Sequence, residues 1–142
     1  MPTFPFISLP TSLIILRVGI PLLFIAHALV RIFNGSIPGF AQFLQTAGFP
    51  QPLLVVWSIT LVELIAGTLL AAGYLQRYAA LALGSIAAGG IVLIHGRIGW
   101  FVGEHGSGGS EYSVCLLLAL LVLAAADSNN DSNNDSRPVT QP

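Results

Sequence analysis

Long apolar runs alternate with short polar connections along this chain. Four such runs cover about residues 9–33, 52–75, 78–95 and 112–126. A helix that crosses the hydrocarbon core of a bilayer needs about 20 apolar residues, and only helices and closed barrels satisfy their backbone groups in lipid. The runs are too long and too uniformly apolar for barrel strands. The pattern therefore predicts an all-α fold, an integral membrane four-helix bundle, in which the two shorter runs extend into their flanks.

The connection at 34–51 predicts a further, short helix. Its apolar residues follow the i, i+3, i+4, i+7 spacing of a one-sided helix, namely Phe40, Phe43, Leu44 and Ala47. Pro38 favours a start there, and the Gly-Phe-Pro sequence at 48–50 favours an end. We expect an amphipathic helix on the membrane surface between the first two spans.

The C-terminal segment differs in kind from the rest. Residues 128–142 repeat Ser, Asn and Asp and contain no apolar face, a composition that predicts disorder. The predicted domains are thus a transmembrane domain at 1–127 and a polar tail at 128–142.

Composition agrees with a membrane protein. Hydrophobic residues make up 54% and charged residues 8% of the chain, whereas a soluble domain has about 25% charged residues. The lipid bilayer is therefore an expected partner. The net charge of -1 argues against nucleic acid, which requires a basic surface. The single cysteine, Cys115, excludes an internal disulfide and is interpreted as a packing residue.

Glu63 lies near the middle of the second run, which contains no other charge. A carboxylate at such depth costs several kcal/mol unless it is paired, protonated or facing water. Arg17 on the first run lies roughly 9 Å deep and Glu63 roughly 15 Å deep from the same side, counting about 1.5 Å per residue. We therefore predict a structural ion pair between Arg17 and Glu63, with proton transfer by Glu63 as the alternative.

The opposite ends of the runs collect further polar residues: His27, Arg31, His95, Arg97, Glu104, His105 and Glu111. No His or Glu spacing places two ligands on one helix face, so no metal site is predicted. His27 and His95 fit either interfacial hydrogen bonding or contact with a ligand. Glu111 fits either the positive end of a helix dipole or proton transfer.

Several segments together resemble the DoxX family of small membrane proteins. The segments are LRVGIPLLFIAHALVRIF, GFAQFLQTAGFP, ELIAG, GYLQRYAA, HGRIGWF and GGSEY, within residues 13–126. Arg31 and Ala28 stand where the family usually has Lys and Gly, and Ala66 replaces the first Gly of its Glu-x-x-Gly-Gly core. Arg77 and Gly67 match the family pattern, and His95, Gly99, Glu111 and Tyr112 carry over. The polar C-terminal repeat departs from the family, in which a Gly-rich stop and a short tail are common.

The resemblance implies a bacterial inner-membrane protein with four helices that takes part in redox reactions. One branch of the family resembles the membrane subunit of a thiosulfate:quinone oxidoreductase, and other members are linked to membrane complexes that handle thiol and oxidative stress. A quinone-linked component is one hypothesis. Its candidate proton-transfer groups are Glu63 and Glu111, and its candidate quinone-binding residues are Arg17, His27, His95 and Tyr112.

The alternatives are a non-catalytic anchor for a soluble oxidoreductase and a carrier of small solutes or protons, which would need a homo-oligomer. The sequence contains no haem, flavin or iron–sulfur motif, so electrons would come from a soluble redox partner or directly from a substrate. The distribution of arginines favours both termini in the cytoplasm.

Overall fold

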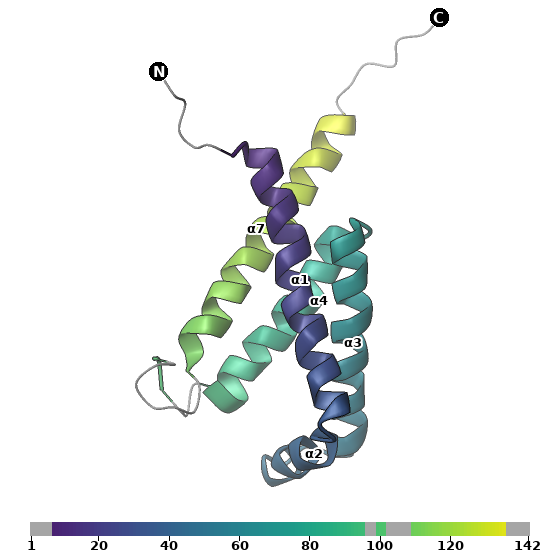
Figure 1. Ribbon diagram of the computed structural model, residues 1–142, viewed down its shortest axis with the longest axis vertical. Helices are drawn as coiled ribbons and strands as arrows, with labels where there is room; N and C mark the ends of the chain where they lie inside the picture. The colour runs from purple at the N-terminus through teal and green to yellow at the C-terminus, as the bar shows by residue number, and fades with distance from the viewer. Residues whose placement is uncertain (1–6, 96–98, 102–108, 136–142) are drawn as a thin grey trace, which may run out of the picture. The chain divides into compact units, whose positions relative to one another are not determined.

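The structure is a computed structural model that describes residues 7–95, 99–101 and 109–135. These residues form helices and no strand: α1 (Leu9–Phe33), α2 (Ile37–Thr46), α3 (Pro52–Ala72), α4 (Gln76–Gly90), η1 (Ile91–His95) and α7 (Ser110–Asp135) (Figure 1). The prediction of an all-α fold with a short helix between the first two long ones is confirmed.

Within the described ranges, four segments are long and apolar enough to cross a membrane. They are Leu9–Phe33, Pro52–Ala72, Gln76–His95 and Ser110–Asp127. The third and fourth segments begin two residues before the predicted runs at 78–95 and 112–126. This agrees with the expectation that the two shorter runs extend into their flanks. The protein is thus a multi-pass membrane protein.

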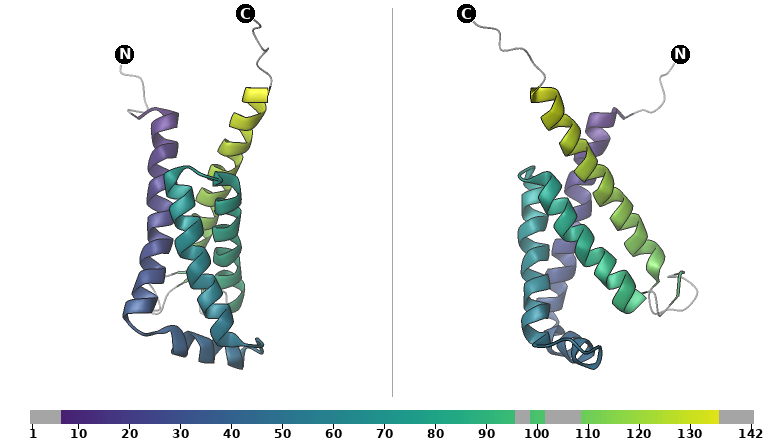
Figure 2. Two further views of the ribbon diagram at one scale, coloured as in Figure 1. Left: turned by 90° about the vertical axis from the view of Figure 1, so that its right-hand side faces the viewer. Right: turned by 180° about the vertical axis from the view of Figure 1, so that it is seen from behind.

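The chain divides into two compact units, Met1–Tyr74 and Leu75–Pro142. In the first unit, α1 and α3 run antiparallel side by side, and α2 packs at the end of the pair where α1 ends and α3 begins (Figure 2). Ser8 caps α1, since its hydroxyl accepts a hydrogen bond from the backbone N–H of Thr11 at 3.4 Å. Gly73 ends α3 in the left-handed conformation, with φ of 83°.

Small residues allow α1 and α3 to approach closely. A Cβ atom added at Gly67 would lie 2.8 Å from Cγ1 of Ile25 and 3.4 Å from the carbonyl oxygen of Pro21. The absent side chain therefore sets the distance between the two helices. It also fixes the register, because Gly67 on α3 lies level with the stretch of α1 from Pro21 to Ile25.

The short helix α2 packs on the start of α3. Ile37, Ala41 and Leu44 are buried there together with Val56, and Phe40 is partly buried. The helix starts one residue before Pro38. Of the residues predicted on its apolar face, Leu44 is buried and Phe43 is 37% exposed.

In the second unit, α4 and α7 run antiparallel and pack a face of small residues against leucines. Ala80, Leu83 and Gly84 of α4 are buried, as are Leu120 and Leu123 of α7.

Asp127 of α7 then joins this helix to the start of α4. Its carboxylate accepts hydrogen bonds from Nε2 of Gln76 at 3.0 Å and from the backbone N–H of Arg77 at 3.1 Å. This supplies the helix cap that Leu75, at the N-cap position, cannot provide.

The helix α7 does not end where the polar tail was predicted to begin. It continues through the Ser/Asn/Asp repeat to Asp135, and residues 136–142 lie outside the described residues. Extending an existing helix avoids the cost of nucleation, so residues of weak helix propensity can follow a stable apolar segment.

Candidate functional site

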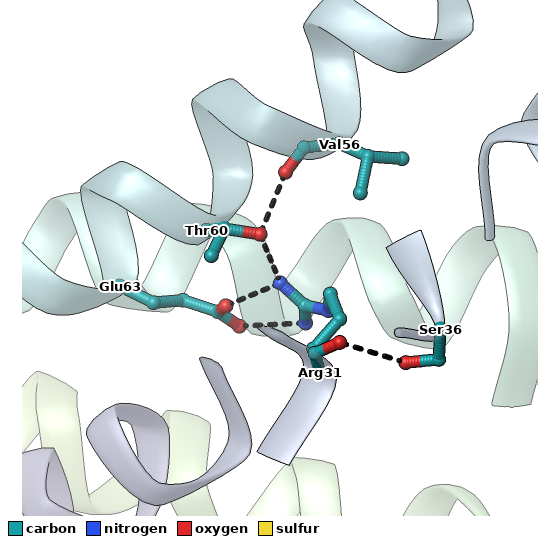
Figure 3. Close-up of polar contacts among 5 residues, drawn as sticks. All are labelled: Arg31, Ser36, Val56, Thr60 and Glu63. Atoms are coloured by element: carbon teal, nitrogen blue, oxygen red, sulfur yellow. Dashed lines mark hydrogen bonds and ion pairs between the residues drawn. The ribbon is translucent and has the colours of Figure 1, made fainter. Parts of the chain in front are cut away.

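A buried ion pair joins α1 to α3. Nη1 of Arg31 donates to Oε2 of Glu63 at 2.7 Å, and Nη2 donates to Oε1 at 3.3 Å (Figure 3). Both residues are buried, with 8% and 2% of their surface exposed. The guanidinium fork thus holds both carboxylate oxygens, the arrangement that makes Arg–carboxylate pairs strong and directional.

Neighbouring groups complete the coordination of this pair. Nη1 of Arg31 also donates to Oγ1 of Thr60 at 2.8 Å, and the Thr60 hydroxyl donates to the carbonyl oxygen of Val56 at 2.8 Å. The Phe40 ring of α2 lies 5.4 Å from Cζ of Arg31, within the range of a cation–π contact. The Arg31 carbonyl in turn accepts from the Ser36 hydroxyl at 3.3 Å (Figure 3). Three helices therefore meet at one arginine.

The predicted partner of Glu63 was wrong: the carboxylate pairs with Arg31 and not with Arg17. The register of α1 and α3 explains the difference. The guanidinium of Arg17 lies beside Gly73, since a Cβ added there would be 3.1 Å from Nη1 of Arg17. Gly73 lies about 15 Å along the helix from Glu63, which is too far for the two side chains to meet. The general expectation that Glu63 pairs with a cation on another helix is nevertheless confirmed.

Arg17 itself is partly buried, and its Nε atom is buried with no hydrogen-bond partner. The guanidinium lies at the C-terminal end of α3, where the negative end of the helix dipole favours a cation. The dipole provides charge complementarity but no acceptor at hydrogen-bond distance for Nε–H.

A second polar group lies where α4, η1 and α7 meet. His95 ends the π-helical turn η1, and its Nδ1 atom is buried without a hydrogen-bond partner. The ring packs against Gly90, where an added Cβ would lie 3.7 Å from Cδ2. A π-helical turn is rare and frequently occurs at functional sites. Here it sets the position of His95 at the end of a membrane span.

Backbone hydrogen bonds connect His95 to the start of α7. The N–H of Gly99 donates to the His95 carbonyl at 3.3 Å, and the Gly99 carbonyl accepts from the N–H of Ser110 at 3.1 Å. The N–H of Glu111 donates to the Trp100 carbonyl at 3.1 Å. The structure therefore brings His95 and the first turn of α7, which carries Glu111, into one region of the second unit.

The other predicted site residues lie elsewhere or on the surface. Tyr112 follows Glu111 on α7 and is 51% exposed. His27 is exposed on α1, and Cys115 is exposed on α7. Among the described residues, no group of three or more His, Cys, Asp or Glu residues could hold a metal ion. Arg97, Glu104 and His105 lie outside the described residues.

Sequence reasoning missed the roles of Thr60 and Phe40. Thr60 is one helical turn before Glu63, so both face the same side of α3. A threonine at that spacing in an otherwise apolar span was a usable signal for a shared hydrogen-bond partner. Phe40 carried no such signal, because its contact with Arg31 depends on how α2 docks.

These features define a class: a small all-α membrane protein whose first two spans are joined by a buried Arg–Glu pair. A comparison with protein families agrees with this class and refines it. The DoxX family model matches residues 12–96. The chain belongs to the DoxX family. Neither the curated proteins nor the solved structures gave a match.

Proposed function

We propose that this DoxX-family protein is a quinone-linked membrane component of a bacterial redox system, one that handles thiols, sulfur compounds or oxidative stress. The observation that carries the proposal is the buried, unpartnered Nδ1 atom of His95 beside the first turn of α7. Buried polar atoms are rarely left without a partner, and each exception calls for an explanation. A hydrogen-bonding ligand at His95 supplies one.

A quinone fits the chemistry of this region. Its carbonyl oxygens accept hydrogen bonds, and its reduction to the quinol takes up a pair of electrons and a pair of protons. A neutral imidazole carries one N–H and one acceptor nitrogen, so His95 in the Nδ1–H tautomer donates to such an oxygen. His95 ends its span, at a depth where an amphiphilic ring can reach it from the lipid.

Glu111 and Tyr112 supply the remaining functional groups in this proposal. A carboxylate in the first turn of α7 can exchange protons with water and relay them to a neighbouring ligand. Tyr112, half exposed, presents a phenol hydroxyl one residue further along. Electrons come from a soluble partner protein or from the substrate itself, since the chain has no haem, flavin or iron–sulfur motif.

The Arg31–Glu63 pair favours a second candidate function, a non-catalytic anchor for a soluble oxidoreductase. Both oxygens of Glu63 are engaged by Arg31, and the carboxylate is 2% exposed. An acid in this state stabilises a packing arrangement and is poorly placed to exchange protons. The burial of Glu63 and the pairing of both its oxygens argue against this residue as the proton-transfer group. They also give no support to the hypothesis of a proton carrier.

Organic extraction of the purified protein, followed by mass spectrometry for quinone, tests the proposal. A titration with a short-chain quinone, followed by quenching of tryptophan fluorescence, measures binding directly. We expect quinone in a stoichiometric amount from the parent protein and its loss from His95→Gln. His27→Gln is the matched control, because His27 is exposed on α1 and should leave binding unchanged. Absence of quinone together with no saturable titration would instead favour the anchor.

A further inference from the structure

We propose that Arg17 forms a binding site for a phosphate group at the C-terminal end of α3, of the kind carried by a phospholipid headgroup. This site lies in the first unit and is distinct from the Arg31–Glu63 pair. It also stands independently of the quinone hypothesis.

The depth of Arg17 favours a counter-charge in addition to the negative end of the α3 dipole. The helix α1 has 25 residues and is about 37 Å long, which exceeds a hydrocarbon core of about 30 Å. Arg17 lies roughly 12 Å from the start of the helix. Its neighbours Ile14, Ile15 and Val18 are exposed, as lipid-facing residues are in a membrane protein. An arginine remains charged in such surroundings and requires an anion or access to the interface.

The structure places the guanidinium beside Gly73. It lies against the backbone of Gly73, where an added Cβ would be 3.1 Å from Nη1, 3.3 Å from Cζ and 3.6 Å from Nη2. Any other residue at this position would crowd the guanidinium, and φ of 83° also favours glycine. The glycine that ends α3 thus makes room for the planar head of Arg17.

Two carbonyl groups near the end of α3 already accept hydrogen bonds from the turn that follows. The N–H of Gly73 donates to the Leu70 carbonyl at 3.1 Å, and the N–H of Tyr74 donates to the Leu69 carbonyl at 2.9 Å. These bonds close the end of α3, and Nε of Arg17 is left buried without an acceptor. No carboxylate among the described residues forms an ion pair with Arg17.

A phosphate group matches what is missing. It is an anion, and its oxygens can accept two parallel hydrogen bonds from the Nη1 and Nη2 groups of the guanidinium, which lie at the end of α3. A long arginine side chain just inside the hydrocarbon region can extend toward the interface, where phospholipid phosphates lie. The exposed apolar residues around Arg17 would contact the acyl chains of the same lipid. A free phosphate offers the same oxygens without those contacts.

Binding measurements on the full chain in a phosphate-free detergent test this site. Dioctanoyl phosphatidylglycerol is the lipid probe, and dioctanoylglycerol, which lacks the phosphate, is its matched control. Native mass spectrometry reports the retained lipid and its affinity. We expect Arg17→Gln to weaken binding of the phosphatidylglycerol by about tenfold or more, as loss of charge-assisted hydrogen bonds predicts. Arg77→Gln, at an exposed arginine of α4, should change the affinity little.

The remaining outcomes are also decisive. Displacement of the lipid by millimolar inorganic phosphate would support the site with a soluble ligand as its source. Unchanged lipid affinity in Arg17→Gln, or equal binding of dioctanoylglycerol, would overturn the proposal. Should Arg17→Gln fail to fold, Arg17→Lys keeps the charge and removes the planar fork. Parent-like affinity in that variant would overturn the two-point contact.

Discussion

The two arginines of α1 are stabilised in different ways. Arg31 reaches a carboxylate on α3 and forms a closed pair with it, at 8% exposure. Arg17 reaches only the end of the α3 dipole, and its Nε has no partner among the described residues. Removal of the positive charge should therefore have different consequences at Arg31 and at Arg17. At Arg31 it disturbs the fold, whereas at Arg17 it changes binding.

Replacing Glu63 with Gln tests the first of these consequences. The variant leaves the Arg31 cation buried without a counter-charge, so we expect the free energy of unfolding to fall by about 3–5 kcal/mol. Chemical unfolding in detergent micelles, followed by circular dichroism, measures the change. The double variant Arg31→Met/Glu63→Leu removes both charges and should recover most of the stability. A Glu63→Gln protein as stable as the parent would mean that the pair contributes nothing to folding.

Thr60 offers a finer test of the same cluster. Thr60→Val keeps the shape of the side chain but removes the acceptor for Nη1 of Arg31, at 2.8 Å, in a fully buried position. Loss of a buried hydrogen bond to a charged group costs about 1–3 kcal/mol. Thr68→Val is the matched control, because the Thr68 hydroxyl is exposed and bonds only to the Leu64 carbonyl of its own helix. Equal unfolding midpoints for the two variants would remove Thr60 from the ion-pair cluster.

At the scale of elements, the packing of α1 on α3 depends on Gly67. Gly67→Ala places a Cβ 2.8 Å from Cγ1 of Ile25, so we expect destabilisation of about 1–3 kcal/mol from overpacking. Gly84→Ala in α4 is the control, since its Cβ would lie at an ordinary 3.5 Å from Leu117. The control should be neutral or gain up to about 1 kcal/mol from helix propensity.

A rescue variant ties the effect to this contact. Ile25→Ala removes the atom that the new Cβ would meet, so the double variant Gly67→Ala/Ile25→Ala should be more stable than the sum of the single effects predicts. Thermal unfolding in detergent measures all four proteins. Additive effects would show that the two residues do not limit the approach of α1 and α3.

The elements were predictable from sequence because their signal is local. Apolar length alone predicts the four spans, and the spacing from Phe40 to Ala47 predicts α2. The partner of Glu63 was not predictable in this way. It depends on the register of α1 against α3, which Gly67 and its contact with Ile25 fix in space. Uniformly apolar helices carry no periodic signal for their register, so depth counting placed Arg17 too close to Glu63.

At the scale of the whole molecule, the placement of the arginines sets the expected orientation in the membrane. An even number of spans places both termini on one side. Arg17, Arg77 and Arg137 lie toward that side in the sequence, and Arg31 and Arg97 lie toward the other. Acidic residues contribute little to this bias, so the pair with Glu63 does not remove Arg31 from the count. Three arginines against two favour the side of the termini, and arginines accumulate in the cytoplasm.

We therefore expect both termini in the cytoplasm. Fusions of alkaline phosphatase, which is active only outside the cytoplasm, should be inactive at either end, and fusions of green fluorescent protein should fluoresce. Removing Arg77 and Arg137 together (both to Gln) should reduce the bias and give a mixed population. The double variant Arg31→Gln/Glu63→Gln removes an arginine from the opposite side and should keep the parent orientation. Active phosphatase at both termini of the parent would reverse the orientation, and would show that Arg31 and Arg97 outweigh the arginines on the terminal side.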